Sequence, residues 1–125
     1  MKNYRDLEIY KLAKKLAVEI HKMTLTLPKF ELYEEGSQIR RSSKAVGANI
    51  VEGYVKRNYK SDFLRQIVIA WAECDETLYH LEIIYETGSL TDKVRYLYFH
   101  NEYEKLSMML NKFYYSVEKG HISKK

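Results

Sequence analysis

Turn-forming residues are scarce in this sequence of 125 residues. It has five glycines and one proline, where average usage would supply about 15 such residues in a chain of this length. An all-β sandwich or barrel needs many turns, so this composition excludes one and favours long helices. Hydrophobic residues make up 46% of the chain and aromatic residues 14%, which is too much for an intrinsically disordered protein.

The sequence also has only one cysteine, Cys74, and no long hydrophobic run. A single cysteine cannot form an internal disulfide or a thiolate metal site, so we expect Cys74 to be a small buried core residue. No apolar run approaches the roughly 18 residues of a transmembrane helix, and the opening segment MKNYRDLEIYKLAKK carries charges where a signal peptide is apolar. We therefore expect a cytoplasmic protein without a membrane segment.

The spacing of apolar residues predicts two helices in the first half of the chain. Apolar positions that recur every three or four residues mark one helix over about residues 6–26, and Pro28 ends it. A second helix is predicted over about residues 36–57, with a narrow face of small and apolar residues. The segment between them predicts a connection.

Two more helices are predicted in the second half. Asn58 or Ser61 is expected to cap the third, which carries the strongest apolar stripe, over residues 63–85. Thr91 is expected to cap the fourth, whose apolar residues recur every three or four positions: Tyr96, Phe99, Tyr103, Leu106, Leu110, Phe113 and Val117. Four long helices with short connections predict an all-α fold, a single domain over residues 1–125 folded as an antiparallel up-down-up-down four-helix bundle.

The third predicted helix carries a second apolar set that consists of Leu64, Val68 and Trp71. One four-helix core rarely uses so wide an apolar surface, so we expect an exposed strip through which the chain associates with itself. The alternative is that this helix is buried centrally in its own bundle.

Positive charge is concentrated in the first half of the chain, although the net charge is only +4. Residues 1–62 contain 13 basic and eight acidic residues, whereas residues 63–125 contain eight and nine. Residues 36–60 contain six basic residues and one acidic residue. Such a stretch either binds polyanions or is only a solvated face.

Patterns typical of enzymes and metal centres are not found. The sequence has no nucleophile elbow, P-loop or glycine-rich phosphate cradle. Di-iron bundles need a glutamate three residues before a histidine on each of two helices; His21, His80 and His100 have none there, so the required pair is missing. Glu76 and His80 are four residues apart and predict a surface contact. We therefore predict a protein that is not an enzyme and has no cofactor and no metal site.

The segment from residue 38 to residue 60 contains six cationic residues and two tyrosines. Phosphates attract lysine and arginine, and unstacked bases stack on aromatic rings, so this segment predicts a site for single-stranded or looped RNA. The predicted nucleic-acid-binding residues are Arg40, Lys44, Tyr54, Lys56, Arg57, Tyr59 and Lys60. The alternative is that Tyr59 only packs across the connection.

Two charges of opposite sign share one face of the second predicted helix. Arg41 and Glu52 are separated by about 16 Å along the helix axis, so they cannot pair with each other. The small residues Ala45 and Ala48 lie between them on the same face and permit close approach of another helix. We expect each charge to pair with a neighbouring helix or subunit, with solvated charges as the alternative.

The block QIRRSSKAVGANIVEGY resembles the signature of the bacterial four-helix bundle proteins, also called 23S rRNA-intervening-sequence proteins. The matching positions are Gln38, Arg40, Arg41, Asn49, Glu52 and Gly53. A second block, DFLRQIVIAWAECDETL, resembles the family at Phe63, Leu64, Ile69, Ala70 and Glu76. The chain departs from the pattern at Lys44, where the family tends to have serine, and at residues 72–74, where it tends to have Gly-Ser-Leu.

The resemblance implies an antiparallel four-helix bundle that assembles as a homopentamer, encoded in some bacteria within sequences that interrupt large-subunit ribosomal RNA genes. A related group, the accessory variability proteins of diversity-generating retroelements, is similar in fold and assembly and is thought to bind nucleic acid and a reverse transcriptase. We therefore expect a non-catalytic oligomer that binds RNA or DNA. The alternative is a protein-interaction scaffold or an accessory protein to a reverse transcriptase. The predicted structural or oligomer-contact residues are Arg41, Asn49, Glu52, Gly53, Leu64, Val68 and Trp71.

Overall fold

The computed structural model describes residues 3–120 and contains four long helices and two short 3-10 helices, with no strand in this range. This confirms the predicted all-α fold with four helices. None of the described helices is long and apolar enough to span a membrane. The elements are η1 (Tyr4–Asp6), α1 (Glu8–Thr24), η2 (Lys29–Leu32), α2 (Glu35–Val55), α3 (Lys60–Glu86) and α4 (Lys93–Glu118).

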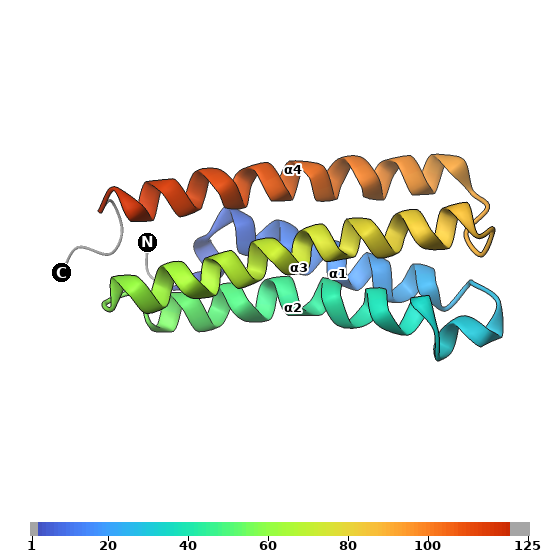
Figure 1. Ribbon diagram of the computed structural model, residues 1–125, viewed down its shortest axis with the longest axis horizontal. Helices are drawn as coiled ribbons and strands as arrows, with labels where there is room; N and C mark the ends of the chain where they lie inside the picture. Colours follow the sequence, from blue (N-terminus) through green and yellow to red (C-terminus); the bar gives the residue numbers. More distant parts are fainter. Residues whose placement is uncertain (1–2, 121–125) are drawn as a thin grey trace.

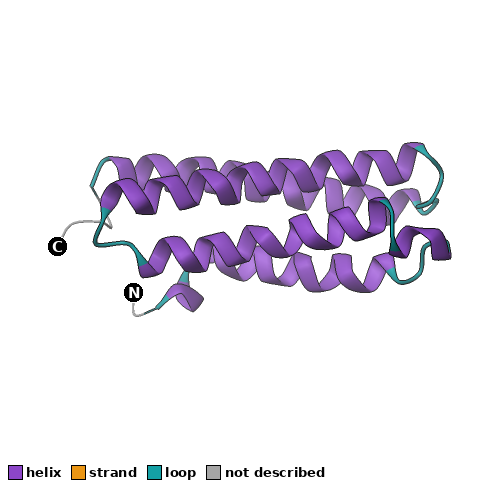
Figure 2. Ribbon diagram, turned by 60° about the horizontal axis from the view of Figure 1, so that its bottom comes forward, coloured by secondary structure: helices purple, strands orange, loops and turns teal. Residues whose placement is uncertain are grey.

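The four helices lie lengthwise beside one another (Figure 1). The start of α1, the turn between α2 and α3, and the end of α4 lie at one end of the molecule, and the other two connections lie at the opposite end (Figures 1 and 2). Both α1 and α3 pack against α2 and α4, and the most extensive contact is between α2 and α3. α1 and α3 therefore stand at opposite corners of the bundle.

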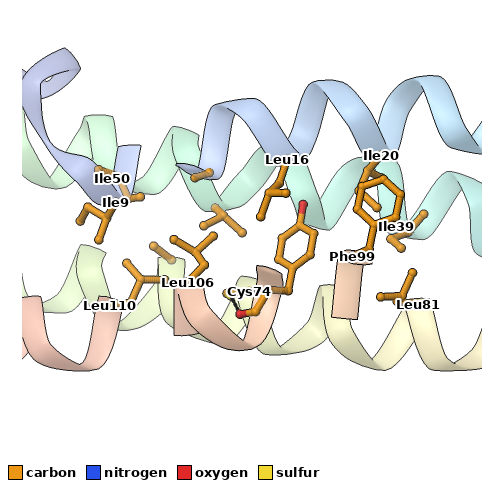
Figure 3. Packing of buried hydrophobic residues seen from close by; sticks show 14 of the residues in the cluster. Ile9, Leu16, Ile20, Ile39, Ile50, Cys74, Leu81, Phe99, Leu106 and Leu110 are labelled. Carbon is orange, nitrogen blue, oxygen red and sulfur yellow. Dashed lines mark hydrogen bonds between the residues drawn. The ribbon is translucent and has the colours of Figure 1, made fainter. Parts of the chain in front are cut away.

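The core lies between the four helices, where the predicted apolar stripes meet. Figure 3 shows Ile9, Leu16 and Ile20 of α1 pointing toward side chains of the other helices. Burial of such side chains is the main source of stability, at about 25 cal/mol for each Å² of apolar surface removed from water. The stripes predicted on α1 and α4 are buried at Ile9, Ala13, Leu16, Ile20, Met23, Phe99, Tyr103, Leu106, Leu110 and Val117.

The helix starts differ from the predicted caps. The N-cap of α4 is Asp92, whose side chain accepts a hydrogen bond from the backbone N–H of Arg95 at 3.1 Å, so the Thr91 prediction is wrong. The N-cap of α3 is Tyr59, which makes no side-chain cap bond, so both Asn58 and Ser61 are wrong. The reason lies in the preceding turn: the N–H of Tyr59 bonds to the carbonyl of Lys56 at 2.8 Å, which brings Tyr59 itself to the cap position.

A buried carboxylate holds the end of the bundle where α2 begins. Glu31 is 2% exposed and accepts hydrogen bonds from the N–H of Gly36 at 2.9 Å and the hydroxyl of Ser89 at 2.5 Å. The first turn of a helix has unpaired N–H groups and a positive dipole end, so a carboxylate is stabilised there. Position 36 must be glycine, because a Cβ would lie 2.3 Å from the Glu31 carbonyl oxygen.

Candidate nucleic-acid interface

The turn between α2 and α3 places three cations and a tyrosine together at one end of the bundle. α2 ends at Val55, and a backbone N–H···O bond of 3.1 Å from Arg57 to Tyr54 tightens the chain before it enters α3. Lys56 and Tyr59 are exposed, and the Tyr59 side chain is 70% accessible. Lys56 makes no ion pair or hydrogen bond with its side chain to residues 3–120. The turn therefore offers positive charge and one open aromatic face.

Tyr54 does not join this surface. Its side chain is buried at 5% exposure, and the Arg57 guanidinium lies 4.2 Å from its ring centroid. Nη1 of Arg57 also donates to the Tyr54 carbonyl at 3.1 Å. Tyr54 was predicted to stack on a base, and this prediction is wrong because the ring is already covered by protein. Arg57 is only half-buried and still presents part of its charge to solvent.

Lys60 links the turn to the far end of the chain. Its ammonium group donates to the backbone carbonyl of Glu118, at the end of α4. The last carbonyls of a helix have no partner within the helix, and a cation there is favourable. Lys60 is exposed, so its charge remains close to the other cations of the turn.

The remaining two predicted cations lie elsewhere. Arg40 points toward the connection that follows α1, where it donates to Thr24 Oγ1 at 3.0 Å and to the carbonyl of Leu32 at 2.8 Å. Its guanidinium is therefore hydrogen-bonded within its own chain, away from the α2–α3 turn, and its contact with a phosphate stays a prediction. Lys44 is exposed, but it lies beside α1, away from the α2–α3 turn.

Arg41 is held by two carboxylates of α3. Its guanidinium lies 2.5 Å from Glu76 and 3.6 Å from Glu73, which confirms the prediction that it pairs with a neighbouring helix. Glu76 also contacts His80 Nε2 at 3.2 Å, and Nδ1 of this histidine lies 2.6 Å from Glu35. Burial, together with the nearby Glu76 carboxylate, raises the pKa of Glu73, although Arg41 lowers it in part. This network links α2 to α3, although the Arg41 side chain is still 52% exposed.

Three other signature residues of α2, Asn49, Glu52 and Gly53, also face α3. Gln66 donates to Asn49 at 3.0 Å and to Glu52 at 3.1 Å, so Glu52 meets an amide and not the cation that we expected. Gly53 lets the helices approach closely, because a Cβ there would lie 3.0 Å from the Cβ of Gln66. We call this contact between α2 and α3, which Arg41, Asn49, Glu52 and Gly53 form with Gln66, Glu73 and Glu76, the seam.

The second apolar set of α3 is divided between two environments. Leu64 and Trp71 are partly buried against the core, and the Trp71 ring N–H donates to Ser107 of α4 at 3.1 Å. Only Val68, at 44% exposure, lies open as predicted. The predicted strip is therefore too wide, because two of its three residues are partly buried within the chain's own bundle.

The remaining candidates for chemistry are the thiol of Cys74 and clusters of metal-ligating side chains. Cys74 is fully buried, as predicted, and burial raises the pKa of its thiol, which keeps it protonated and unreactive. Within residues 3–120, no three His, Cys, Asp or Glu side chains gather in a way that would hold a metal ion.

Sequence reasoning missed a second basic region, on the outer face of α1. Arg5 and four lysines of α1 line a shallow depression together with Tyr10, Val18 and Glu19. The signal was present in the sequence, because these lysines recur on the face opposite the apolar stripe. The lysines are Lys11, Lys14, Lys15 and Lys22.

Comparisons with known proteins give a family match and a similar solved structure. The profile of the family described as 23S rRNA-intervening sequence protein matches residues 5–112. The chain is similar to the crystal structure of a protein of unknown function from the S23 ribosomal protein family of Bacteroides thetaiotaomicron. The TM-score is 0.76 at 25% identity, over 85% of this chain and 94% of that chain. No relative is found among curated proteins. Because the family profile covers most of its length, the chain belongs to the family of 23S rRNA-intervening sequence proteins.

Proposed function

We propose that this protein is a non-catalytic oligomer that binds RNA through the turn between α2 and α3. In this proposal the subunit is an antiparallel up-down-up-down bundle, and five subunits form a ring. The observation that carries the proposal is the composition and exposure of residues 56–60: three cations, one open tyrosine and no acidic residue. The family's name and the resemblance to its signature support RNA as the polyanion.

The chemistry of the turn fits a single-stranded or looped RNA. Lys56, Arg57 and Lys60 supply charges for phosphates, and Tyr59 supplies a flat face on which a base can stack. One such site is weak. A ring presents the same site several times on a rigid body, and a tethered second contact benefits from a high effective concentration. The proposal therefore depends on repetition of a small site.

Titration of a fluorescent RNA hairpin across a series of salt concentrations tests this proposal. The affinity is expected to fall linearly with salt on logarithmic axes, because bound phosphates release counterions. The triple variant Lys56→Gln/Arg57→Gln/Lys60→Gln is expected to lower the affinity at least about tenfold at low salt and to flatten the slope. A matched control, Lys29→Gln/Lys93→Gln/Arg95→Gln, removes the same charge at the other end of the bundle and is expected to change little.

An equal loss of affinity in the two triple variants would mean that RNA binding depends on net charge and not on the turn at residues 56–60. Binding that does not depend on salt would overturn the electrostatic site altogether. The alternative of a protein-interaction scaffold, including an accessory role beside a reverse transcriptase, then becomes the better proposal. Circular dichroism of both variants shows that the helices are retained, so a loss of binding is not a loss of fold.

A further inference from the structure

An apolar groove runs along the outside of the bundle between α1 and α2. Its volume is about 460 Å³; small or short side chains form much of its walls, and Tyr10 and His21 of α1 also line it. The groove exists because neither helix fills the space between them: a Cβ at Gly47 would meet only the Cβ of Ala13, at 3.9 Å. The residues that form what we call the α1–α2 groove are Ala13, Ala17, Val18, Gly47, Ala48 and Val51.

Three lysines border this groove. Lys14 and Lys22 come from α1, and Lys44 comes from α2. All three are exposed, and none forms a side-chain hydrogen bond or ion pair with residues 3–120. An apolar surface surrounded by unpaired cations fits an apolar helix face that carries carboxylates.

The same chain presents such a face on α3. Residues on its outer side are spaced by one, three or four positions and are unusually apolar: Val68 is 44% exposed, Ile69 37% and Tyr79 57%. Of the six acidic residues of α3, Glu73, Glu76 and Glu82 pair with cationic or histidine side chains of this chain. Asp75 is an exposed carboxylate on this outer side, although it also accepts a hydrogen bond from Ser107 at 2.9 Å. We call this outer face the α3 ridge, and it consists of Val68, Ile69, Ala72, Asp75 and Tyr79.

We propose that the α3 ridge of one copy of the chain seats in the α1–α2 groove of the next copy. The inference rests on the proposed oligomer and names its contact surfaces. Ridges of larger side chains pack into grooves between small ones, and here the Asp75 carboxylate of the ridge meets the lysine border. Groove against groove would bring six lysines together, and ridge against ridge would oppose the two Asp75 carboxylates. Charge therefore favours the head-to-tail contact over a symmetric dimer.

The placement of the two surfaces also bears on the shape of the assembly. Because both border α2, they are not on directly opposite sides of the bundle. A head-to-tail contact between inclined surfaces curves the array, and a curved array closes into a ring when the rotation permits. In this arrangement Lys44 belongs to the subunit contact, and residues 56–60 remain free for RNA.

Two surface variants test the inference in the full-length chain. Val18→Arg/Ala48→Arg fills the groove, and Val68→Arg/Ala72→Arg disrupts the ridge; all four positions are exposed. Each variant alone is expected to sediment as a monomer of about 14.9 kDa. An equimolar mixture is expected to form a one-to-one complex and nothing larger, because only one intact groove and one intact ridge can meet. The matched control Val94→Arg/Leu97→Arg alters exposed apolar residues of α4 and is expected to assemble as the wild type does.

The outcomes separate this inference from the proposed oligomer. A wild-type monomer at tens of micromolar would overturn both. A wild-type oligomer that either double variant leaves intact, or variants that remain monomeric when mixed, would overturn the groove and ridge contact alone. If a double arginine variant loses its helical circular dichroism signal, the milder pair Ala48→Gln and Ala72→Gln gives the same mixing test with weakened assembly in place of its loss.

Discussion

The residues on the two sides of α2 differ in how closely they pack against the neighbouring helix. On the side toward α3, Arg41, Asn49 and Glu52 reach polar partners and Gly53 allows close packing. On the side toward α1, Gly47 and its neighbours leave an open groove. Both sides contain glycine or alanine at helical spacing, yet one is a tight seam and the other is a free surface.

The comparison shows why a sequence signature need not mark a binding site. The signature residues of α2 that face α3 form hydrogen bonds and ion pairs inside the chain, so their role is to hold two helices in register. The residues available for a partner are those that the seam does not use: the turn at residues 56–60 and the small residues facing α1. Three predictions sharpen this contrast.

The largest expected effect separates the two glycines. Gly53→Ala places a methyl group 3.0 Å from the Cβ of Gln66, which cannot move without its helix, so we expect a loss of about 1–3 kcal/mol in the free energy of unfolding. Gly47→Ala meets only an alanine methyl at 3.9 Å, and alanine is the better helix former, so we expect a gain of about 0.5–1 kcal/mol. Urea denaturation at equal protein concentration measures both. Equal effects of the two substitutions would contradict the difference between the seam and the groove.

A smaller effect is expected at the hydroxyl pair in the middle of the seam. Ser42 and Thr77 are both fully buried, and their oxygens lie 2.8 Å apart. Thr77→Val keeps the shape but removes the partner of Ser42, so we expect a loss of about 1 kcal/mol in stability. Adding Ser42→Ala to this variant is expected to recover part of that loss, because no buried hydroxyl is then left without its partner. Strict additivity in this double-mutant cycle would mean that the two hydroxyls do not interact.

The helices and their core were predictable because apolar periodicity is a local property. The predicted ranges 6–26 and 36–57 lie within two residues of α1 and α2 at each end. The stripes of α1 and α4 are buried as their spacing requires. Lengthwise packing of four such stripes leaves little freedom, so the fold class follows from the pattern.

The candidate site was less predictable because it depends on contacts between distant residues. Periodicity does not show that Arg40 turns back to Thr24, or that Arg57 covers Tyr54. The buried Glu31 had no signal at all, because its partners Gly36 and Ser89 meet it only in the folded chain. Charge composition located the basic turn, but only the fold separates the free cations from the engaged ones.

The smallest expected effect concerns Glu73, a carboxylate of the seam whose ionised form is disfavoured by burial. Burial raises the pKa of Glu73 above its ordinary value of 4.5. At a pH between these two pKa values, the folded chain keeps a proton on Glu73 that the unfolded chain has released. Stability contributed by this group is therefore lost as the pH rises from about 4.5 through the raised value, and at neutral pH the ionised carboxylate is unfavourable.

Glu73→Gln is expected to raise the free energy of unfolding at pH 7 by less than about 1 kcal/mol, and to reduce its decline as the pH rises above 4.5. The matched substitution Glu76→Gln is expected to act in the opposite direction. Glu76 lies 2.5 Å from Arg41 and 3.2 Å from His80, and its ionised form stabilises both contacts. Urea denaturation between pH 4 and pH 8 measures the two variants side by side. A loss of stability in both would mean that Arg41 needs both carboxylates, and that the seam tolerates the burial of Glu73 for the sake of that ion pair.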